Sequence, residues 1–226
     1  MDENSDTIKL ALANRQFLYQ LIARCFSEEA DGALVGALTS EHTLKELLLV
    51  PPIDEVKCAT TKLQSLINHY GDEIVTAART EYAHVFLGPG ALPSSPWESV
   101  HITGKNLLFQ PQTLNVRDSY RSAGFLPMRY PAVADDHIAL ELDFLANVAT
   151  KARNSFDEND RAACIQSLSI HRQFLDDHLL VWIDEYRNEL AQDGMSDFYA
   201  AASSLAAAIA KRDRSLLDEL LDVVVK

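Results

Sequence analysis

Apolar residues recur at three- to five-residue steps along most of this chain of 226 residues. The stretch 6–26 shows the pattern with Ile8, Leu12 and Leu21, and the stretch 137–153 carries two adjacent apolar stripes. Such spacing is that of an amphipathic helix, and a face as broad as the second belongs in a core. The sequence therefore predicts an all-α fold of about ten helices. Besides these two, helices are predicted over 32–38, 42–49, 53–70, 72–87, 111–123, 158–178, 179–190, 196–210 and 214–225.

One segment, residues 82–100, interrupts the helical pattern and is called the Gly/Pro segment below. It holds closely spaced glycines, prolines and an aromatic ring: Gly88, Gly90, Pro89, Pro93, Pro96 and Trp97. Proline fixes φ and removes an N–H donor, and glycine adopts conformations that other residues avoid, so a long, stiff loop is predicted here. Long ordered loops within compact domains tend to carry function. We therefore expect a binding surface on this segment.

No Ser/Gly-rich or Pro-rich linker and no repeat divides the chain, so residues 1–226 are predicted to form a single domain. The Ala-rich run 199–210 is too short, and too interrupted by serine, to span a bilayer, so no membrane insertion is expected. The first ten residues are acidic and no apolar core follows, unlike a secretory signal. The three cysteines show no CxxC spacing. These features predict a cytoplasmic protein.

The charge balance restricts the partners of this protein. Asp and Glu number 33 against 20 Lys and Arg, a formal net charge of −13. That sign opposes binding to nucleic acid phosphates or anionic lipid and would attract a basic partner. Plain solubility is the alternative reason for the charge, because net charge governs association and not fold.

No recognised catalytic or nucleotide-binding motif occurs: GxSxG, HExxH and a full GxxxxGK[ST] are all missing. The sharpest polar cluster is Asp135-Asp136-His137, with Glu141 one helical turn beyond His137. As a metal site it has no clear further ligands, so neither a metal nor a cofactor is predicted. An aspartate before a helix also serves as an N-cap. We expect Asp136 and His137 to lie near the Gly/Pro segment and to form the polar wall of a groove.

The order of these features resembles the TorD/DmsD/NarJ family of redox-enzyme maturation chaperones, and the TorD/DmsD type in particular. The resemblance covers about residues 10 to 210. One departure is that Val133 and Ala134 stand where the family usually has Glu or Gln, then Pro. The matching pieces are Tyr82 with Phe86-Leu87-Gly88-Pro89, Pro96-Trp97-Glu98-Ser99-Val100, Leu114 with Arg117 and Tyr120, Asp135-Asp136-His137-Ile138 with Glu141-Leu142, Phe174-Leu175 with His178-Leu179 and Trp182, and Asp197-Phe198-Tyr199.

The resemblance implies a cytoplasmic chaperone, and not an enzyme, that binds the twin-arginine leader peptide and the apo form of a molybdenum oxidoreductase. It holds this client until cofactor insertion and hands it to the twin-arginine export machinery. A leader carries guanidinium groups beside an apolar stretch, so its receptor needs carboxylates and an aromatic groove. The expected peptide-binding residues are Phe86, Leu87, Pro96, Trp97, Glu98, Asp136 and His137, followed by Asp135, Arg117 and Tyr120.

Other interpretations remain open from the sequence. Some family members are linked to nucleotides, which keeps a GTP- or metal-dependent enzyme on the same fold as an alternative, although no phosphate-binding motif supports it. A helical adaptor for another basic partner is a further alternative. The resemblance permits either a monomer or a domain-swapped homodimer. Ordinary core packing would also explain Trp97, and an internal ion pair with a residue such as Arg117 would explain Glu98.

Overall fold

The computed structural model describes residues 3–49, 54–88, 90–127 and 133–225. In these residues the regular structure is helical, and no strand is present beyond one isolated β-bridge, which confirms the predicted all-α class. The eleven α-helices of the described residues are α1 (Glu3–Ser27), α2 (Gly32–Thr39), α3 (Glu41–Leu48), α4 (Asp54–Tyr70), α5 (Ile74–Tyr82), α6 (Glu98–Thr103), α7 (Pro111–Ser122), α8 (Ile138–Asp157), α9 (Arg161–Phe174), α10 (Leu180–Asp193) and α11 (Asp197–Val225).

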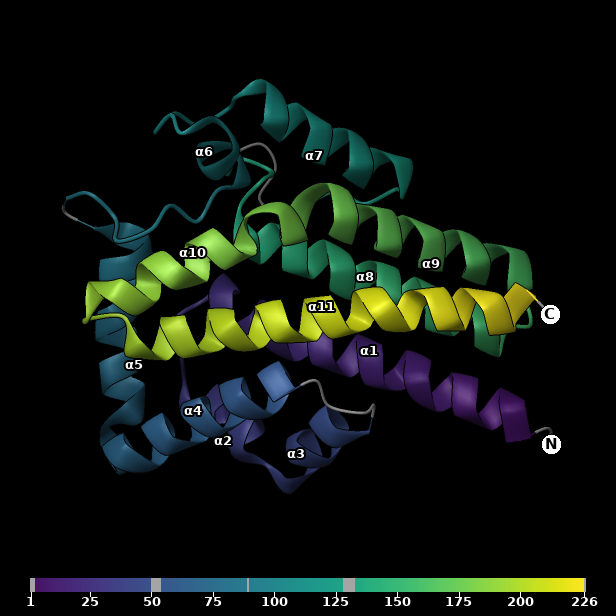
Figure 1. Ribbon diagram of the computed structural model, residues 1–226, viewed down its shortest axis with the longest axis horizontal. Helices are drawn as coiled ribbons and strands as arrows, with labels where there is room; N and C mark the ends of the chain where they lie inside the picture. The colour runs from purple at the N-terminus through teal and green to yellow at the C-terminus, as the bar shows by residue number, and fades with distance from the viewer. Residues whose placement is uncertain (1–2, 50–53, 89, 128–132, 226) are drawn as a thin grey trace.

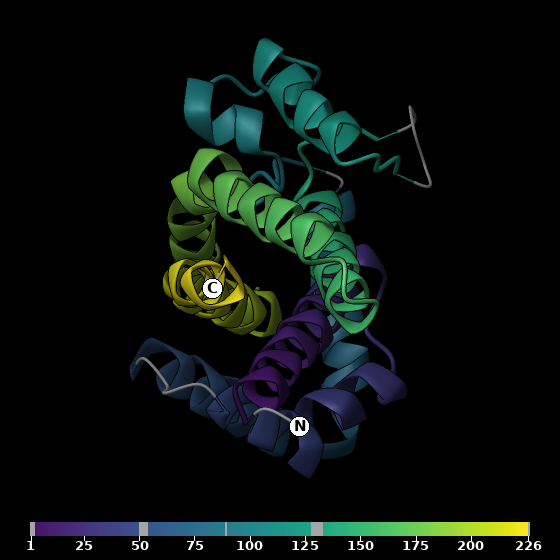
Figure 2. The same cartoon turned by 90° about the vertical axis from the view of Figure 1, so that its right-hand side faces the viewer.

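The long helices α1, α8, α9, α10 and α11 form the middle of the molecule, with α6 and α7 on one side and α2, α3 and α4 on the other (Figure 1). The view along the long axis shows the same order, with the two chain ends at one end of the molecule (Figure 2). The predicted broad apolar face of α8 is buried between α1 and α9. No helix of the described residues is long and apolar enough to cross a membrane.

Helix α11 contains the Ala-rich run, and the run lies in the core. Every residue from 200 to 210 except Ser204 is buried. Because alanine adds little bulk, neighbouring helix backbones can approach closely, and α11 contacts α1, α4, α9 and α10. The two helices predicted over 196–210 and 214–225 are one continuous helix, since no glycine or proline separates them.

Two wide helical turns differ from the predicted boundaries. A π segment, Leu175–Leu179, joins α9 to α10, where the sequence suggested two separate helices. A second π segment, Ala83–Leu87, extends α5 into the start of the Gly/Pro segment, and a 3-10 turn, Gly71–Glu73, precedes α5. π turns often occur at functional sites. The true loop therefore begins only at Gly88, whose φ of 62° is a conformation that glycine adopts readily.

A buried ion pair connects the first and last helices. Arg15 of α1 donates to both carboxylate oxygens of Asp213 of α11, at 2.5 and 3.1 Å, and both side chains are almost fully buried. His171 Nε2 of α9 lies 3.1 Å from Asp213 Oδ2. Although burial acts in the opposite direction, Arg15 and His171 hold the pKa of Asp213 well below its ordinary value. Three helices thus meet at one carboxylate.

We predict that Asp213→Ala lowers the free energy of unfolding by about 3–5 kcal/mol, because it leaves the Arg15 guanidinium buried without its carboxylate. The double variant Arg15→Met/Asp213→Leu should recover most of this loss, since it removes both charges. Urea denaturation followed by circular dichroism measures both. A loss below about 1 kcal/mol in Asp213→Ala would show that the pair does not stabilise the core.

Candidate functional site

Two motifs far apart in the sequence meet in a short antiparallel β-bridge. The Glu98 N–H donates to the Asp136 carbonyl at 3.0 Å, and the Ile138 N–H donates to the Pro96 carbonyl at 2.9 Å. These bonds pair Trp97 with His137. The structure thereby brings the Gly/Pro segment and the Asp-His pair together. The proximity could only be hypothesised from the sequence, because Trp97 and His137 are 40 positions apart.

The Asp136 carboxylate caps a helix that is distant in the sequence. Its Oδ2 accepts the Ser99 N–H of α6 at 2.9 Å, and the residue has no exposed surface. Trp97, the residue before α6, provides no side-chain cap of its own. A carboxylate at a helix N-terminus satisfies a free N–H and interacts favourably with the helix dipole. Helix α6 was missed in the sequence for this reason, since its cap comes from another part of the chain.

The four acidic side chains beneath the Gly/Pro segment, Glu98, Asp135, Asp136 and Glu141, are called the acid cluster. All four are buried. The Asp135 carboxylate accepts a hydrogen bond from Arg117 Nε at 2.6 Å, and the Tyr120 hydroxyl donates to the Asp135 backbone carbonyl at 2.8 Å. The sequence had suggested Glu98 as a partner of Arg117, but the structure pairs Arg117 with Asp135.

Glu98 and Glu141 face α10 and the π segment before it. His178 Nδ1 lies 3.1 Å from Glu98 Oε2, and Ser119 Oγ lies 3.0 Å from the other ring nitrogen. The Trp182 indole N–H donates to Glu141 Oε2 at 3.2 Å. Burial, and then the adjacent Glu98 carboxylate, raises the pKa of Glu141 well above its ordinary value. Glu141 is therefore held in its neutral form more readily than an exposed glutamate.

Three oxygens of the acid cluster are buried without a hydrogen-bond partner among the described residues: Asp135 Oδ1, Asp136 Oδ1 and Glu141 Oε1. The indole Nε1 of Trp97 is a donor that is likewise buried without a hydrogen-bond partner among the described residues. Each unsatisfied buried polar group costs about 1–3 kcal/mol. The site therefore holds more acceptors than its own donors satisfy.

An aromatic rim covers the acid cluster. The Trp97 and His137 rings lie edge to face with centroids 5.3 Å apart, and Phe86 lies 6.0 Å from His137. Trp97 and Phe86 are half-buried, and Pro96 is buried. Leu87, at the end of the π segment, is 65% exposed. Of the predicted apolar groove residues, Leu87 is thus the one that solvent reaches most freely.

His137 is a helix cap in this structure. Its Nδ1 accepts the Ala139 N–H at 3.1 Å at the start of α8, so this nitrogen carries no proton. Burial lowers the pKa of His137 to about 4, against the opposing effect of Asp136. Before the Asp-His pair, Ala134 is buried and Val133 is half-buried.

An exposed apolar stretch, not predicted from the sequence, lies between α6 and α7. The backbone of Phe109 has a positive φ of 58°, a conformation that is uncommon for a bulky residue. A run of three apolar residues between Gly104 and Pro111 was the available signal. The exposed apolar side chains of this stretch and of the two helices flanking it are Ile102, Leu107, Leu108, Phe109 and Leu114, each more than 40% exposed.

Residues 53–188, more than half of the chain, match the model of the nitrate reductase delta subunit family. The match spans the Gly/Pro segment and the acid cluster. The chain belongs to this family, whose members include the TorD, DmsD and NarJ chaperones that the sequence motifs resemble.

Curated relatives agree with the family assignment. "Chaperone protein TorD" of Vibrio cholerae serotype O1 (El Tor Inaba N16961) is 29% identical over 201 residues, covering 89% of this chain and 84% of the relative. "Chaperone protein TorD" of Vibrio atlanticus is 25% identical, covering 84% and 82%. "Probable Tat proofreading chaperone DmsD" of Haemophilus influenzae is 26% identical, covering 55% and 54%. These relatives are chaperones, so the family is not one of enzymes.

We predict that the wild-type protein loses stability relative to His137→Asn as the pH falls from 7 to 4. The folded His137 stays neutral to about pH 4, whereas the unfolded side chain takes up a proton near 6.5. The unfolded state thus binds more protons in this window, and the loss approaches at most about 3 kcal/mol. Asparagine keeps a capping acceptor but does not titrate.

Chemical denaturation of both proteins at half-unit pH steps measures this difference. Only the change in the difference with pH matters, because asparagine also removes the ring contacts. Parallel pH profiles would contradict a neutral capping role for His137.

Proposed function

We propose that this protein is a cytoplasmic chaperone that binds the twin-arginine leader peptide of an immature molybdenum oxidoreductase. Family membership, the name "Probable Tat proofreading chaperone DmsD" of one relative and the chemistry of the site support this proposal. According to this proposal, the apo-enzyme stays bound to the chaperone until its cofactor is inserted, and then passes to the export machinery. The net charge of −13 favours association with a basic peptide.

One observation carries the proposal: the acid cluster has buried carboxyl oxygens that no described donor satisfies. A guanidinium group brings five N–H donors in a planar arrangement that matches carboxylates. Arg117 on Asp135 is an example of this pairing within the site. In our proposal, a leader arginine donates to the unsatisfied Oδ1 of Asp136 and pairs with the neighbouring Glu98 carboxylate, both of whose oxygens already contact His178.

The burial of the acid cluster sets a condition for this contact. Asp136 has no exposed surface, so a guanidinium reaches it only when the bridge between Trp97 and His137 separates. That bridge consists of two hydrogen bonds, which contribute roughly 0.5–1.5 kcal/mol each. Charge-assisted bonds to the arginine, at about 1.5–3 kcal/mol each, offset the loss. We propose that the Gly/Pro segment opens over the acid cluster as the leader binds.

The apolar part of the leader would contact the aromatic rim and the surface beside it. Leu87 and the partly exposed Trp97 and Phe86 are apolar groups available there. The exposed apolar stretch between α6 and α7, which follows the bridge in the sequence, adds further apolar surface. Exposed apolar groups of this kind often mark an interaction surface. A leader that is released later suits a micromolar dissociation constant, about −8 kcal/mol.

We predict that Asp136→Asn weakens binding of a labelled twin-arginine leader by about tenfold or more, the equivalent of one lost charge-assisted bond. Asparagine retains an oxygen that accepts the Ser99 N–H, so α6 keeps its cap and only the charge is removed. Asp136→Ala should in addition lower the thermal stability. Fluorescence anisotropy titrations measure the binding of each variant.

The matched control is Asp118→Asn, which removes an exposed carboxylate of α7 and should leave the affinity unchanged. A leader with both arginines changed to lysine should bind wild type more weakly, because lysine lacks the planar donor pair. If Asp136→Asn binds the leader as wild type does, Asp136 acts only as a cap and the proposed arginine contact is wrong.

A further inference from the structure

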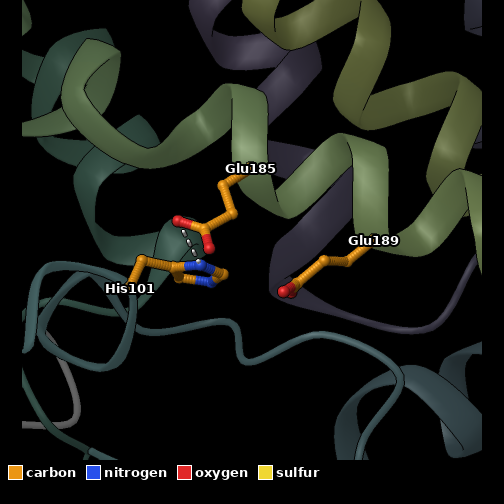
Figure 3. Close-up of side chains that lie close together, drawn as sticks. All are labelled: His101, Glu185 and Glu189. Atoms are coloured by element: carbon orange, nitrogen blue, oxygen red, sulfur yellow. Dashed lines mark ion pairs between the residues drawn. The ribbon is translucent and has the colours of Figure 1, made fainter. Parts of the chain in front are cut away.

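His101 of α6 points toward two glutamates of α10, Glu185 and Glu189 (Figure 3). One ligand atom from each of the three side chains lies within 4.8 Å of the other two. Glu185 and Glu189 are one helical turn apart, so their carboxylates lie on one face of α10. Among the described residues, no other group of three His, Cys, Asp or Glu side chains converges in this way.

The hydrogen bonding of His101 fixes where its proton lies. Nε2 is 2.7 Å from the Ser95 carbonyl oxygen, which only accepts hydrogen bonds, so Nε2 carries the hydrogen. In the neutral ring the lone pair is then on Nδ1, and Nδ1 lies 3.6 Å from Glu185 Oε2. A lone pair facing a carboxylate is unfavourable unless a positive charge lies between them. A cation bound by both groups provides that charge.

The surroundings hold the imidazole in this orientation. The side chain of His101 is 4% exposed, and its ring stacks on Trp182 with centroids 5.1 Å apart and an angle of 27°. A ring N–H donated to a backbone carbonyl is the usual way in which proteins orient a metal-binding histidine. Glu189 is oriented in turn by Ser94 Oγ, which donates to its Oε2 at 2.6 Å.

We propose that His101 Nδ1, Glu185 and Glu189 bind a divalent transition-metal ion of the zinc class. One imidazole nitrogen with two carboxylates suits such an ion better than Mg²⁺ or Ca²⁺, which prefer oxygen alone. The three ligand atoms lie within 4.8 Å of one another, and in our proposal a small inward movement of a side chain brings each to about 2.0–2.2 Å from zinc. Glu185 can move in this way, since its side chain is 60% exposed. A water completes the coordination.

The bound ion would connect three parts of the chain. His101 belongs to α6, the glutamates belong to α10, and Ser94 and Ser95 of the Gly/Pro segment hold the ligands in place. The metal would thus link the Gly/Pro segment and α6 to α10. This role is separate from leader binding and is proposed independently of it.

Isothermal titration of tag-free protein with ZnCl₂ at pH 7.5 tests the proposal. All proteins carry Cys58→Ser, because Cys58 is an exposed thiol that could bind zinc itself. We expect one zinc per chain, and binding at least about tenfold weaker in Glu185→Gln and in His101→Gln. Glu219→Gln, which removes an exposed carboxylate of α11, is the matched control and should bind as the parent does.

Hydrogen exchange gives a second readout. Zinc should slow amide exchange over residues 91–103 in the parent, and not in Glu185→Gln, whose exposed position leaves the fold undisturbed. Failure of the parent to bind zinc at 100-fold molar excess would overturn the site. Equal binding by the parent and Glu185→Gln would overturn the ligand assignment, and zinc binding without slower exchange would overturn the proposed link.

Discussion

The Asp136 carboxylate holds together the part of this molecule in which its chemistry lies. It caps α6 through the Ser99 N–H, while its own backbone carbonyl accepts the Glu98 N–H and the nearby Ile138 N–H donates to the Pro96 carbonyl. These few bonds attach the Gly/Pro segment to the start of α8, which is itself buried between α1 and α9. The aromatic rim, the acid cluster and the contact between α6 and α10 all depend on this attachment. A helix as short as α6 would gain little stability without such a cap.

The acid cluster contains more buried carboxyl groups than stability alone would favour. Burial raises the pKa of Glu141, and only Arg117 and His178 are basic partners of the cluster among the contacts described. Buried charges destabilise a fold unless they are paired, in contrast to the Arg15 and Asp213 pair, where each charge meets its opposite. An acid cluster with unsatisfied oxygens is reasonable in a chaperone if a basic client completes it. Stability would then be exchanged for recognition, as functional sites often require.

Helical elements could be predicted from the sequence wherever local pattern decides them. Helices α1, α4, α7 and α8 lie within a few residues of their predicted ranges, because apolar periodicity and flanking proline or glycine are local signals. The predicted break within α11 was wrong, since charged residues at its middle do not interrupt a helix. Helix α6 was missed because its cap is 37 residues away.

The sequence by itself determined the all-α class, the Gly/Pro-rich interruption of the helices and the family, since these depend on residues close together in the chain. It also identified Trp97, Glu98, Asp136 and His137 as residues of interest. Only the tertiary structure decided what these residues do: that the carboxylates are buried, that Asp136 caps α6, and that His101 faces Glu185. Such contacts join residues distant in the sequence, and helical periodicity specifies which face is buried but not which partner it meets.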